Sequence, residues 1–332
     1  MKAISLDGIN LPLTITNVSK PKLKANEALV QLKMAALNRR DYWIHKGLYA
    51  GLKFPIIIGS DGAGIVEDVK SEDGAGWLGK EVIINPSINW GSSERAQGSG
   101  FHILGLPENG TFAEYVNVPI ENLFPLPPHL TFEEAAALPL GGLTAWRALF
   151  SRAKLAKGER VLITGIGGGV ASMALQFAIQ MGAEVYVTSG KRAKLKKAIE
   201  LGALGGALYT DKHWKEKLNE IGGFDVILDS ASGAEFAHYI DLTRPGGRIV
   251  FYGATVSGNI PDLNARKIFW KQLSILGTTM GSSKDFMAML DFVNQYKIKP
   301  IIDSVLPMAH IEEAMQKMEC NEHFGKLVLR VH

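Results

Sequence analysis

The fold of this chain is decided by residues 160–171, which read RVLITGIGGGVA. Apolar residues typical of a buried strand lead into a glycine-rich turn, and a helical pattern follows over residues 172–182. A second strand pattern occupies residues 183–188. Glycines between a strand and a helix let a phosphate approach the backbone, and the helix N-terminus offers free N–H groups. The segment therefore predicts a βαβ unit that binds the pyrophosphate of a dinucleotide.

This glycine turn departs from the strict G-x-G-x-x-G fingerprint. The nearest alignment puts Ile166, Gly168 and Ala171 at the three key positions. The turn still has the context that the fingerprint requires, because it follows a strand and opens a helix. This context favours dinucleotide binding over a turn whose glycines serve packing alone. The residues expected to contact the cofactor here are Gly165, Gly167, Gly168, Gly169 and Val170.

Strand and helix patterns alternate after the proline-rich passage at residues 125–128. The strand patterns lie at residues 161–164, 183–188, 224–229, 247–252 and 273–278. Alternation of this kind predicts parallel βαβ units, and therefore an α/β fold with a doubly wound parallel sheet. Thr131 and Glu134 have the spacing of a capping box at the first helix. We place this dinucleotide-binding domain at residues 125–279.

The remaining residues predict a second, β-rich domain. Residues 1–124 contain short strand patterns separated by turn residues, and residues 85–110 show little periodicity. A helical pattern at residues 284–296 and two strand patterns follow the parallel domain. We expect residues 280–332 to return to the first domain and complete it, with a cleft between the two domains.

Composition excludes several classes of function. The chain has 332 residues, of which 46% are hydrophobic and 21% charged, with a net charge of +3. No basic patch interleaved with aromatic residues indicates nucleic-acid binding. The uncharged run at residues 161–183 reads as a buried βα unit rather than a membrane span, because its glycines are clustered. Cys320 is the single cysteine, which is typical of a cytoplasmic protein without disulfides. The expected partner is a small molecule, with no nucleic acid or membrane.

The end of the second strand distinguishes between the two nicotinamide cofactors. An NAD site usually carries a carboxylate there, for the ribose 2′-hydroxyl. This chain has none, and offers instead the hydroxyl of Ser189 and the cations of Lys191, Arg192 and Lys194. Hydroxyls and cations suit a 2′-phosphate. We therefore predict NADP(H) rather than NAD(H), the alternative being an ordinary solvated, basic helix start.

Seven short segments carry a resemblance to a known family. They are LNRRD (37–41), GSDGAGIV (59–66), GTFAEYV (110–116), AAALP (135–139), GLTAW (142–146), the glycine turn and GKLVL (325–329). In this order and spacing they resemble the medium-chain dehydrogenase/reductase superfamily over essentially the whole chain. The resemblance implies a GroES-like catalytic domain, a Rossmann cofactor domain and an active site between them.

The resemblance also implies that the zinc sites of this superfamily are missing. Its zinc-dependent alcohol dehydrogenases hold catalytic zinc with Cys, His and Cys, and those positions here carry Asn38, Ser60 and Leu140. Leucine cannot ligate a metal, and an amide with a hydroxyl does not replace thiolate and imidazole. Residues 86–108 lack the four cysteines of the structural zinc lobe. We expect no metal, and a likeness to the zinc-free quinone oxidoreductases, whose motif spaces Asn and Asp as Asn38 and Asp41 are spaced.

Without a metal, hydride transfer to an ordinary ketone lacks its main electrophilic help. Quinones and α,β-unsaturated carbonyls are already electron-poor, so positioning and a few hydrogen-bond donors can suffice. We predict Asn38 and Tyr42 as donors and Asp41 as an orienting group, with Tyr49 a further candidate. The alternatives are a turn role for the asparagine and core packing for the tyrosines. Two other functions stay open, a zinc-independent aldehyde or alcohol oxidoreductase and a non-catalytic NADPH-binding redox sensor.

Further expectations concern the cofactor, the substrate pocket and assembly. The resemblance implies cofactor contacts from Thr144, Gly253, Ala254, Gly277, Thr278 and Lys326. It also implies a homodimer, in which the strand near residues 273–279 pairs with its copy. Trp90, Phe101 and Trp270 are candidates to line an apolar pocket, with core packing as the alternative.

Overall fold

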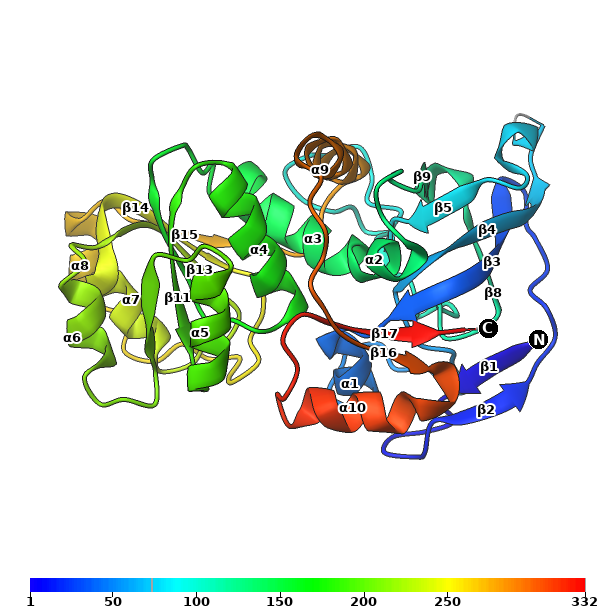
Figure 1. Cartoon of the computed structure of the whole chain (residues 1–332), viewed down its shortest axis with the longest axis horizontal. Helices are drawn as coiled ribbons and strands as arrows, with labels where there is room; N and C mark the ends of the chain where they lie inside the picture. The colour runs from blue at the N-terminus through cyan, green and yellow to red at the C-terminus, as the bar shows by residue number, and fades with distance from the viewer. Residues whose placement is uncertain (73, 332) are drawn as a thin grey trace. The chain divides into compact units, whose positions relative to one another are not determined.

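The computed structural model describes residues 1–72 and 74–331, which form two compact units. Unit 1 comprises Met1–Gly141 and Gly281–His332, and unit 2 comprises Gly142–Met280 (Figure 1). The boundary that we placed at 124/125 is therefore too early. Helix α2 (Phe132–Ala137) belongs to unit 1, because it packs against the sheet of that unit.

The sheet of unit 2 is parallel throughout and has six strands. Their order is β12 (Gly205–Leu208), β11 (Glu184–Ser189), β10 (Arg160–Ile163), β13 (Phe224–Asp229), β14 (Thr243–Phe251) and β15 (Ser274–Gly277). Numbered along the chain this is 3-2-1-4-5-6, the order of the Rossmann fold, which reverses between β10 and β13. The predicted doubly wound sheet is confirmed.

Helices connect these strands, and the main core of unit 2 lies beneath them. Their bounds are α3 (Pro139–Trp146), α4 (Gly169–Gln180), α5 (Arg192–Glu200), α6 (Trp214–Asn219), α7 (Phe236–Leu242) and α8 (Ala265–Trp270), with a π-helix at Arg147–Arg152. Leu162, Ile227 and Ile249 come from three adjacent strands and are fully buried in one cluster. Buried residues on adjacent strands are what parallel sheets require, since helices cover both faces.

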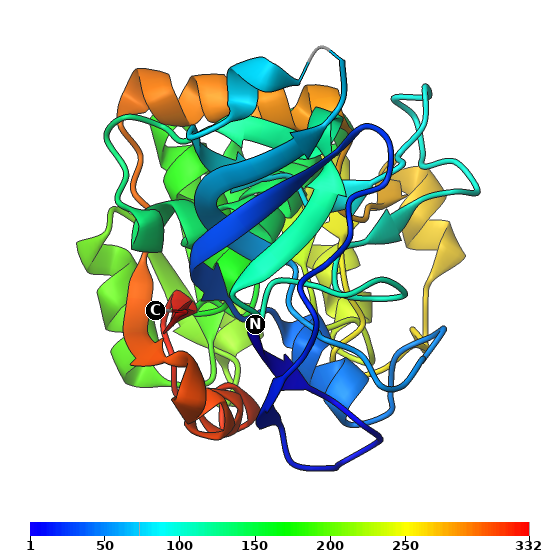
Figure 2. The ribbon, with the colours of Figure 1, turned by 90° about the vertical axis from the view of Figure 1, so that its right-hand side faces the viewer.

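Unit 1 is built on a mostly antiparallel sheet. Its strand order is β16 (Ile302–Pro307), β17 (Lys326–Arg330), β3 (Glu27–Ala36), β4 (Asp61–Lys70), β5 (Glu81–Ile84) and β9 (Leu123–Pro125), and β8 (Tyr115–Pro119) also pairs with β3. Figure 2 shows β3, β4 and β8 side by side. The pairing of Val328 with Ala36 brings the C-terminal segment into this sheet, as the sequence predicted.

Smaller elements complete unit 1. They are the pairs β1 (Lys2–Ser5) with β2 (Thr14–Asn17) and β6 (Ser87–Ile88) with β7 (His102–Ile103), and helices α1 (Arg39–His45), α9 (Ser283–Tyr296) and α10 (Ile311–Glu319). Short 3₁₀ turns lie at Ala75–Trp77, Ile120–Asn122 and Met308–His310. The predicted capping box at Thr131 and Glu134 is confirmed, since each side chain bonds the backbone N–H of the other residue.

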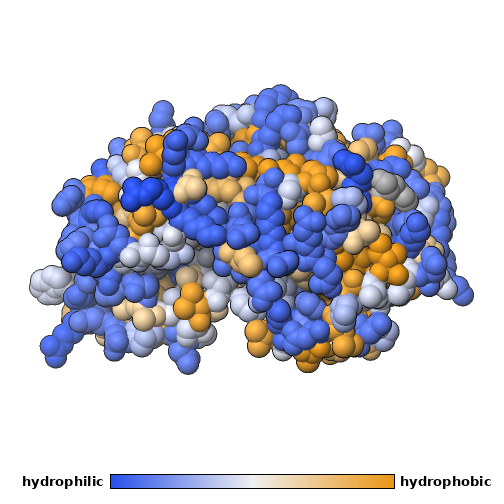
Figure 3. All heavy atoms as spheres, turned by 60° about the horizontal axis from the view of Figure 1, so that its bottom comes forward, coloured by the Kyte–Doolittle hydropathy of each residue, from blue (hydrophilic) through white to orange (hydrophobic). Residues whose placement is uncertain are grey.

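Across the described residues, no helix has the length and apolar character needed to cross a membrane. On the face drawn in Figure 3, hydrophobic residues form separate patches among hydrophilic ones.

Candidate functional site

The glycine turn of unit 2 leaves the start of α4 open. Gly165 and Gly167 have φ of +63° and +133°, values that glycine adopts without strain. Gly168 is the N-cap of α4 and provides no side-chain cap. A Cβ atom at Gly168 would meet nothing within 4 Å. The first N–H groups of α4 are therefore available to an anion, and the binding of a cofactor phosphate there stays a prediction.

Lys194 lies directly against this turn. A Cβ atom at Gly167 would sit 2.8 Å from the Lys194 ammonium nitrogen. The lysine comes from the first turn of α5, so two neighbouring helices contribute to one place. The ammonium adds a full positive charge to the partial charge at the N-terminus of α4. This arrangement is suited to the phosphates of a dinucleotide.

The end of β11 carries hydroxyls and cations without a carboxylate. Thr188 Oγ1 accepts the N–H of Gly165 at 3.1 Å, which ties the turn to this strand. Ser189 Oγ accepts the N–H of Lys191 at 3.1 Å, and the serine is buried. The side chains of Lys191 and Arg192 are exposed beside it. The predicted phosphate-binding residues are thus gathered at one strand end, while their preference for NADP stays a prediction.

Asp229 was not singled out from the sequence. It lies where the strand order of the sheet reverses, between β10 and β13, and its hydrogen bonds stabilise the loops there. It ends β13 and is fully buried. Its carboxylate accepts hydrogen bonds from Thr164 Oγ1 at 2.6 Å and from the N–H of Ser232 at 2.7 Å. Burial raises the pKa of this carboxyl. The signal in the sequence was an aspartate at the end of an apolar strand.

The other predicted cofactor residues of unit 2 follow strand ends or lie on α3. Thr144 is buried, and its hydroxyl lies 3.9 Å from the Met280 sulfur. Gly253 and Ala254 follow β14, Gly277 ends β15, and Thr278 comes next. The hydroxyl of Thr278 is buried and has no hydrogen-bond partner among the described residues. Ligands of such sheets bind beyond the carboxyl ends of the strands, so these positions are suitable, and their roles stay predictions.

In unit 1, Lys326 forms the centre of a buried polar cluster. Its ammonium donates to Leu37 O at 2.7 Å, to Asn38 Oδ1 at 2.7 Å and to Asp61 Oδ2 at 2.9 Å. The lysine is 3% exposed and the aspartate 0%. All three N–H donors are therefore used within the protein. A cofactor contact by Lys326, still a prediction, would have to replace one of these bonds.

Asn38 is held in one orientation by the same cluster. Its Nδ2 donates to Asp61 Oδ2 at 2.9 Å, while its Oδ1 accepts from Lys326. Because an ammonium only donates and a carboxylate only accepts, the amide cannot be flipped. The other carboxylate oxygen of Asp61 accepts the N–H of Leu140 at 2.8 Å. We call these three residues the Asn38–Asp61–Lys326 cluster, and it leaves one amide N–H of Asn38 for a ligand.

Asp41 and Tyr42 occupy different surroundings. Asp41 is fully buried and accepts the N–H of Asn38 at 2.8 Å and that of Gly59 at 3.3 Å. Burial raises the pKa of Asp41 to about 6. Tyr42 donates its hydroxyl to Glu319 of α10 at 2.9 Å, and burial raises its pKa. The predicted role of Asp41 in orienting backbone groups agrees with these bonds, whereas the Tyr42 proton already has an acceptor.

Arg40 is a further buried residue that the sequence did not single out. Its Nη1 donates to Ser60 Oγ at 2.7 Å and to Leu104 O at 2.9 Å. The guanidinium lies 5.1 Å from the centre of the Tyr49 ring. Nothing in the sequence distinguished Arg40 from Arg39, which bonds Asn321 instead.

The positions aligned with zinc ligands do not suit zinc. Ser60 bonds Arg40 and Leu104, and the amide of Asn38 is held by Lys326 and Asp61. Within residues 1–72 and 74–331, no three His, Cys, Asp or Glu side chains gather in a way that could hold a metal ion. Asn38 and Ser60 therefore belong to a hydrogen-bonded network with the cations of Lys326 and Arg40, and not to a set of metal ligands.

The aromatic candidates differ in their burial. Trp90 is 4% exposed and packs edge-on against Phe101, with 5.3 Å between the ring centres. Trp270 lies at the end of α8 and is 82% exposed. Trp270 was predicted to line an apolar pocket or to pack in the core. It does neither, because it lies on the surface at the end of the short helix α8.

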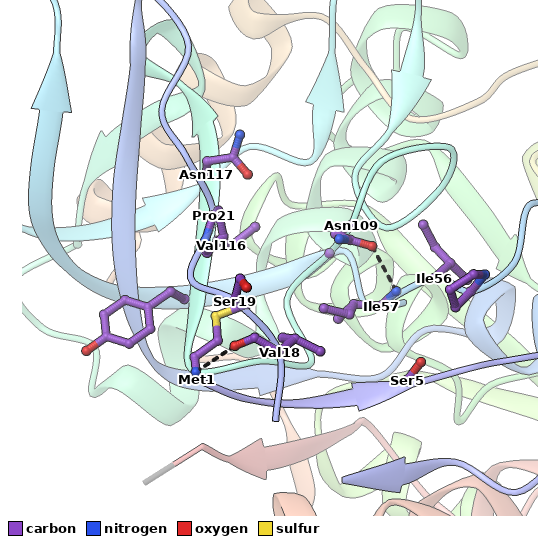
Figure 4. Close-up of a pocket in the computed structure, with 13 residues that line it drawn as sticks. Met1, Ser5, Val18, Ser19, Pro21, Ile56, Ile57, Asn109, Val116 and Asn117 are labelled. Carbon is purple, nitrogen blue, oxygen red and sulfur yellow. Dashed lines mark hydrogen bonds between the residues drawn. The ribbon is translucent and has the colours of Figure 1, made fainter. Parts of the chain in front are cut away.

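A pocket of about 190 Å³ lies elsewhere in unit 1 (Figure 4). It is lined in part by Met1, Ser19, Ile57 and Asn109. Its backbone polar groups are partly engaged, since the Met1 ammonium donates to Val18 O at 2.8 Å and Ile57 N–H donates to Asn109 Oδ1 at 3.0 Å. No predicted site residue lines this pocket, so it is separate from both sites above.

Comparison with known proteins gives matches over nearly the whole chain. Residues 24–128 match the alcohol dehydrogenase GroES-like domain, and residues 169–295 match the zinc-binding dehydrogenase family. A zinc-type alcohol dehydrogenase-like protein, YogA of Leptosphaeria maculans, is 37% identical over 96% of this chain and 95% of its own length. An acryloyl-coenzyme A reductase of Sulfurisphaera tokodaii is 28% identical over 99% and 100%. A crystal structure of an NAD-dependent alcohol dehydrogenase superimposes with a TM-score of 0.92 at 37% identity, covering all of both chains.

Proposed function

The chain belongs to the medium-chain dehydrogenase/reductase superfamily, and from this premise we propose that it is an NADPH-dependent reductase of quinones or α,β-unsaturated carbonyl compounds that works without zinc. Its relatives include proteins named as alcohol dehydrogenases and as an acryloyl-coenzyme A reductase. It is an oxidoreductase of this superfamily, and the proposal concerns its cofactor, its acceptor and its independence of metal.

The observation that carries the proposal of NADPH is the cationic end of β11. Ser189, Lys191 and Arg192 stand where an NAD site has a carboxylate, and Lys194 lies against Gly167. A 2′-phosphate carries nearly two negative charges, and cations with hydroxyls compensate for its lost hydration. A ribose 2′-hydroxyl would find no carboxylate to accept its hydrogen bond in this segment. The residues present therefore favour NADPH over NADH.

The Asn38–Asp61–Lys326 cluster supports an acceptor that needs no metal. NADPH, when bound, supplies the hydride. The remaining N–H of Asn38 can donate to the acceptor oxygen, where negative charge develops in the transition state. Asp61 and Lys326 hold the amide in the required orientation, so no reorganisation is needed at the moment of reaction. One fixed donor is enough for an acceptor that delocalises charge, whereas a simple ketone demands more.

NADPH oxidation by the purified protein tests this function with a panel of quinones, enones and aldehydes. We expect turnover of quinones or enones, and a KM for NADPH well below that for NADH. Elemental analysis of the same preparation should find no stoichiometric zinc. Stoichiometric zinc, required for activity, would overturn the metal-free proposal.

Substitution of the cations at the end of β11 tests the cofactor assignment separately. Lys191→Ala with Arg192→Ala should raise the KM for NADPH by about tenfold or more and leave that for NADH nearly unchanged, because two charge-assisted contacts are lost. Lys196→Ala with Lys197→Ala removes the same charge from α5 and is the matched control. An equal rise in both double variants would show a general charge effect instead.

The same assays separate two other functions. The names of several relatives favour an alcohol oxidoreductase. In this chain it would work without zinc, and it would show turnover of aldehydes but not of enones. A redox sensor would bind NADPH tightly and turn over no acceptor in the panel.

A further inference from the structure

Arg40 has unused hydrogen-bonding capacity in a buried place. The side chain is 7% exposed, and its Nη1 uses its hydrogens on Ser60 Oγ and Leu104 O. Its Nε is shielded from solvent and has no partner among the described residues, and no described residue bonds Nη2. The edge of the guanidinium formed by Nε and Nη2 is therefore unpaired.

Arg40 forms no salt bridge with a described residue, although its charge opposes the rise in the pKa of the neighbouring Asp41 carboxyl. Its two hydrogen-bond acceptors are a hydroxyl and a carbonyl, both neutral. The carboxylate of Asp41 faces the N–H groups of Asn38 and Gly59, and that of Asp61 is bound by Lys326. No carboxylate of the described chain lies within ion-pairing distance of this guanidinium. A buried guanidinium with unpaired N–H groups is costly, so a site that keeps one generally has a use for it.

The guanidinium is nevertheless fixed in position. Ser60, which accepts from it, is itself fully buried and donates to Leu104 O at 2.8 Å. The ring of Tyr49 lies 5.1 Å from the guanidinium carbon. Two acceptors and an aromatic ring leave the side chain little freedom, so its open edge points in a defined direction before any ligand arrives.

We propose that the open edge of Arg40 binds a carboxylate of the substrate, so that the preferred acceptors carry a carboxylate group. This inference rests on the proposed function, because it names the class of acceptor. Two parallel N–H donors match the two oxygens of a carboxylate. A single guanidinium suits a monoanion, whereas a phosphate dianion would need further cations.

The position of Arg40 gives this contact a use in the reaction. Arg40 bonds Ser60 and Asn38 bonds Asp61, so the two side chains reach consecutive residues of the chain. A carboxylate held by Arg40 would bring the rest of a small acceptor near the amide of Asn38. Anchoring a remote group in this way lowers the cost of placing the reacting carbonyl.

A matched pair of enones tests the proposal. The ion (E)-4-oxopent-2-enoate carries the carboxylate, and (E)-pent-3-en-2-one lacks it. We expect the Arg40→Met variant to lose about 10- to 100-fold in kcat/KM for the anion and to keep its value for the neutral enone. Arg40→Lys should recover part of the loss, since it keeps the charge without the paired donors. Arg330→Met removes an exposed arginine of unit 1 and should change neither value. Equal losses for both enones in Arg40→Met would show a structural role and overturn the proposal.

Binding measured without turnover separates this proposal from the proposed function. Benzoate should raise the Tm of the wild-type protein and of Arg330→Met, but not that of Arg40→Met, and neutral benzamide should raise none of them. Circular dichroism establishes that the variants are folded. Benzoate binding that depends on Arg40, with no acceptor turned over, would support the carboxylate-binding site and overturn the reductase function. Turnover of neutral enones with no preference for the anion, or tighter binding of inorganic phosphate than of benzoate, would overturn the carboxylate site.

Discussion

Asp41 makes the stability of this protein depend on pH in a predictable direction. Burial raises its pKa to about 6 from 3.8; Asp61 acts in the same direction, and Arg40 and Lys326 oppose the rise. The folded state therefore holds a proton that the unfolded state releases between these values, so rising pH lowers the free energy of unfolding. The shift corresponds to about 3 kcal/mol.

Urea unfolding of the wild type and of Asp41→Asn between pH 4 and pH 7 measures this effect. Asn cannot ionise, so the wild type should lose about 3 kcal/mol relative to the variant as pH rises through this window. Other titrating groups cancel in the difference between the two proteins. A wild type that gains stability relative to Asp41→Asn over the same range would contradict the assignment.

Lys326 and Asp61 are expected to depend on each other. Lys326→Met leaves a fully buried carboxylate without its ammonium, and such a loss typically costs about 3–5 kcal/mol. The double variant with Asp61→Asn removes both charges and should be more stable than the sum of the single losses predicts. Free energies of unfolding of the four proteins give the coupling. Simple additivity would mean that the ion pair does not hold this cluster together.

Only part of this site could be predicted from the sequence. Asn38 and Asp41 share a short motif, so their proximity could be predicted. Lys326 and Asp61 are 265 positions apart, and their bond exists only because β17 joins the sheet beside β3. Arg40 follows another arginine, and which of the two is buried depends on the faces of α1 that other segments cover.

Among the elements, the β6–β7 hairpin contains an aromatic pair that we expect to stabilise it. Trp90 packs on Phe101 within the segment where zinc-dependent relatives are expected to carry four cysteines. Phe101→Ala should cost about 1 kcal/mol and increase hydrogen exchange at residues 86–103 more than elsewhere. Leu48→Ala removes an apolar side chain that is 69% exposed and serves as the control. Unchanged exchange in the hairpin of Phe101→Ala would show that other contacts hold it.

The local sequence pattern predicted the bounds of some strands and missed others. Strands β10, β11, β13 and β15 begin and end within two residues of their predicted positions, because their apolar runs are bounded by clear turn residues. Strand β12 (Gly205–Leu208) was not predicted, since two of its residues are glycine, which weakens the strand signal. The domain boundary was misplaced because the packing of α2 on β3 and β4 is a tertiary contact.

At the scale of the whole molecule, the edge of the sheet in unit 2 predicts assembly. Strand β15 is the last in sheet order, and within the described part of the chain it pairs with β14 alone, which leaves a row of backbone groups open to another strand. Helix α8 nearby exposes Phe269 at 66% and Trp270 at 82%, and such apolar exposure is typical of an interface. With the resemblance noted above, we predict a homodimer through this edge.

Sedimentation equilibrium should therefore give twice the 36.1 kDa mass of the chain. Introducing charge with Phe269→Glu and Trp270→Glu should shift the protein to the monomer. Two carboxylates buried against their copies would destabilise the dimer by more than the interface stabilises it. Leu204→Glu places the same charge at an exposed leucine preceding β12, at the opposite edge of the sheet, and should leave the dimer intact. A wild-type monomer, or a dimer that survives the double substitution and dissociates with Leu204→Glu, would place the interface elsewhere or remove it.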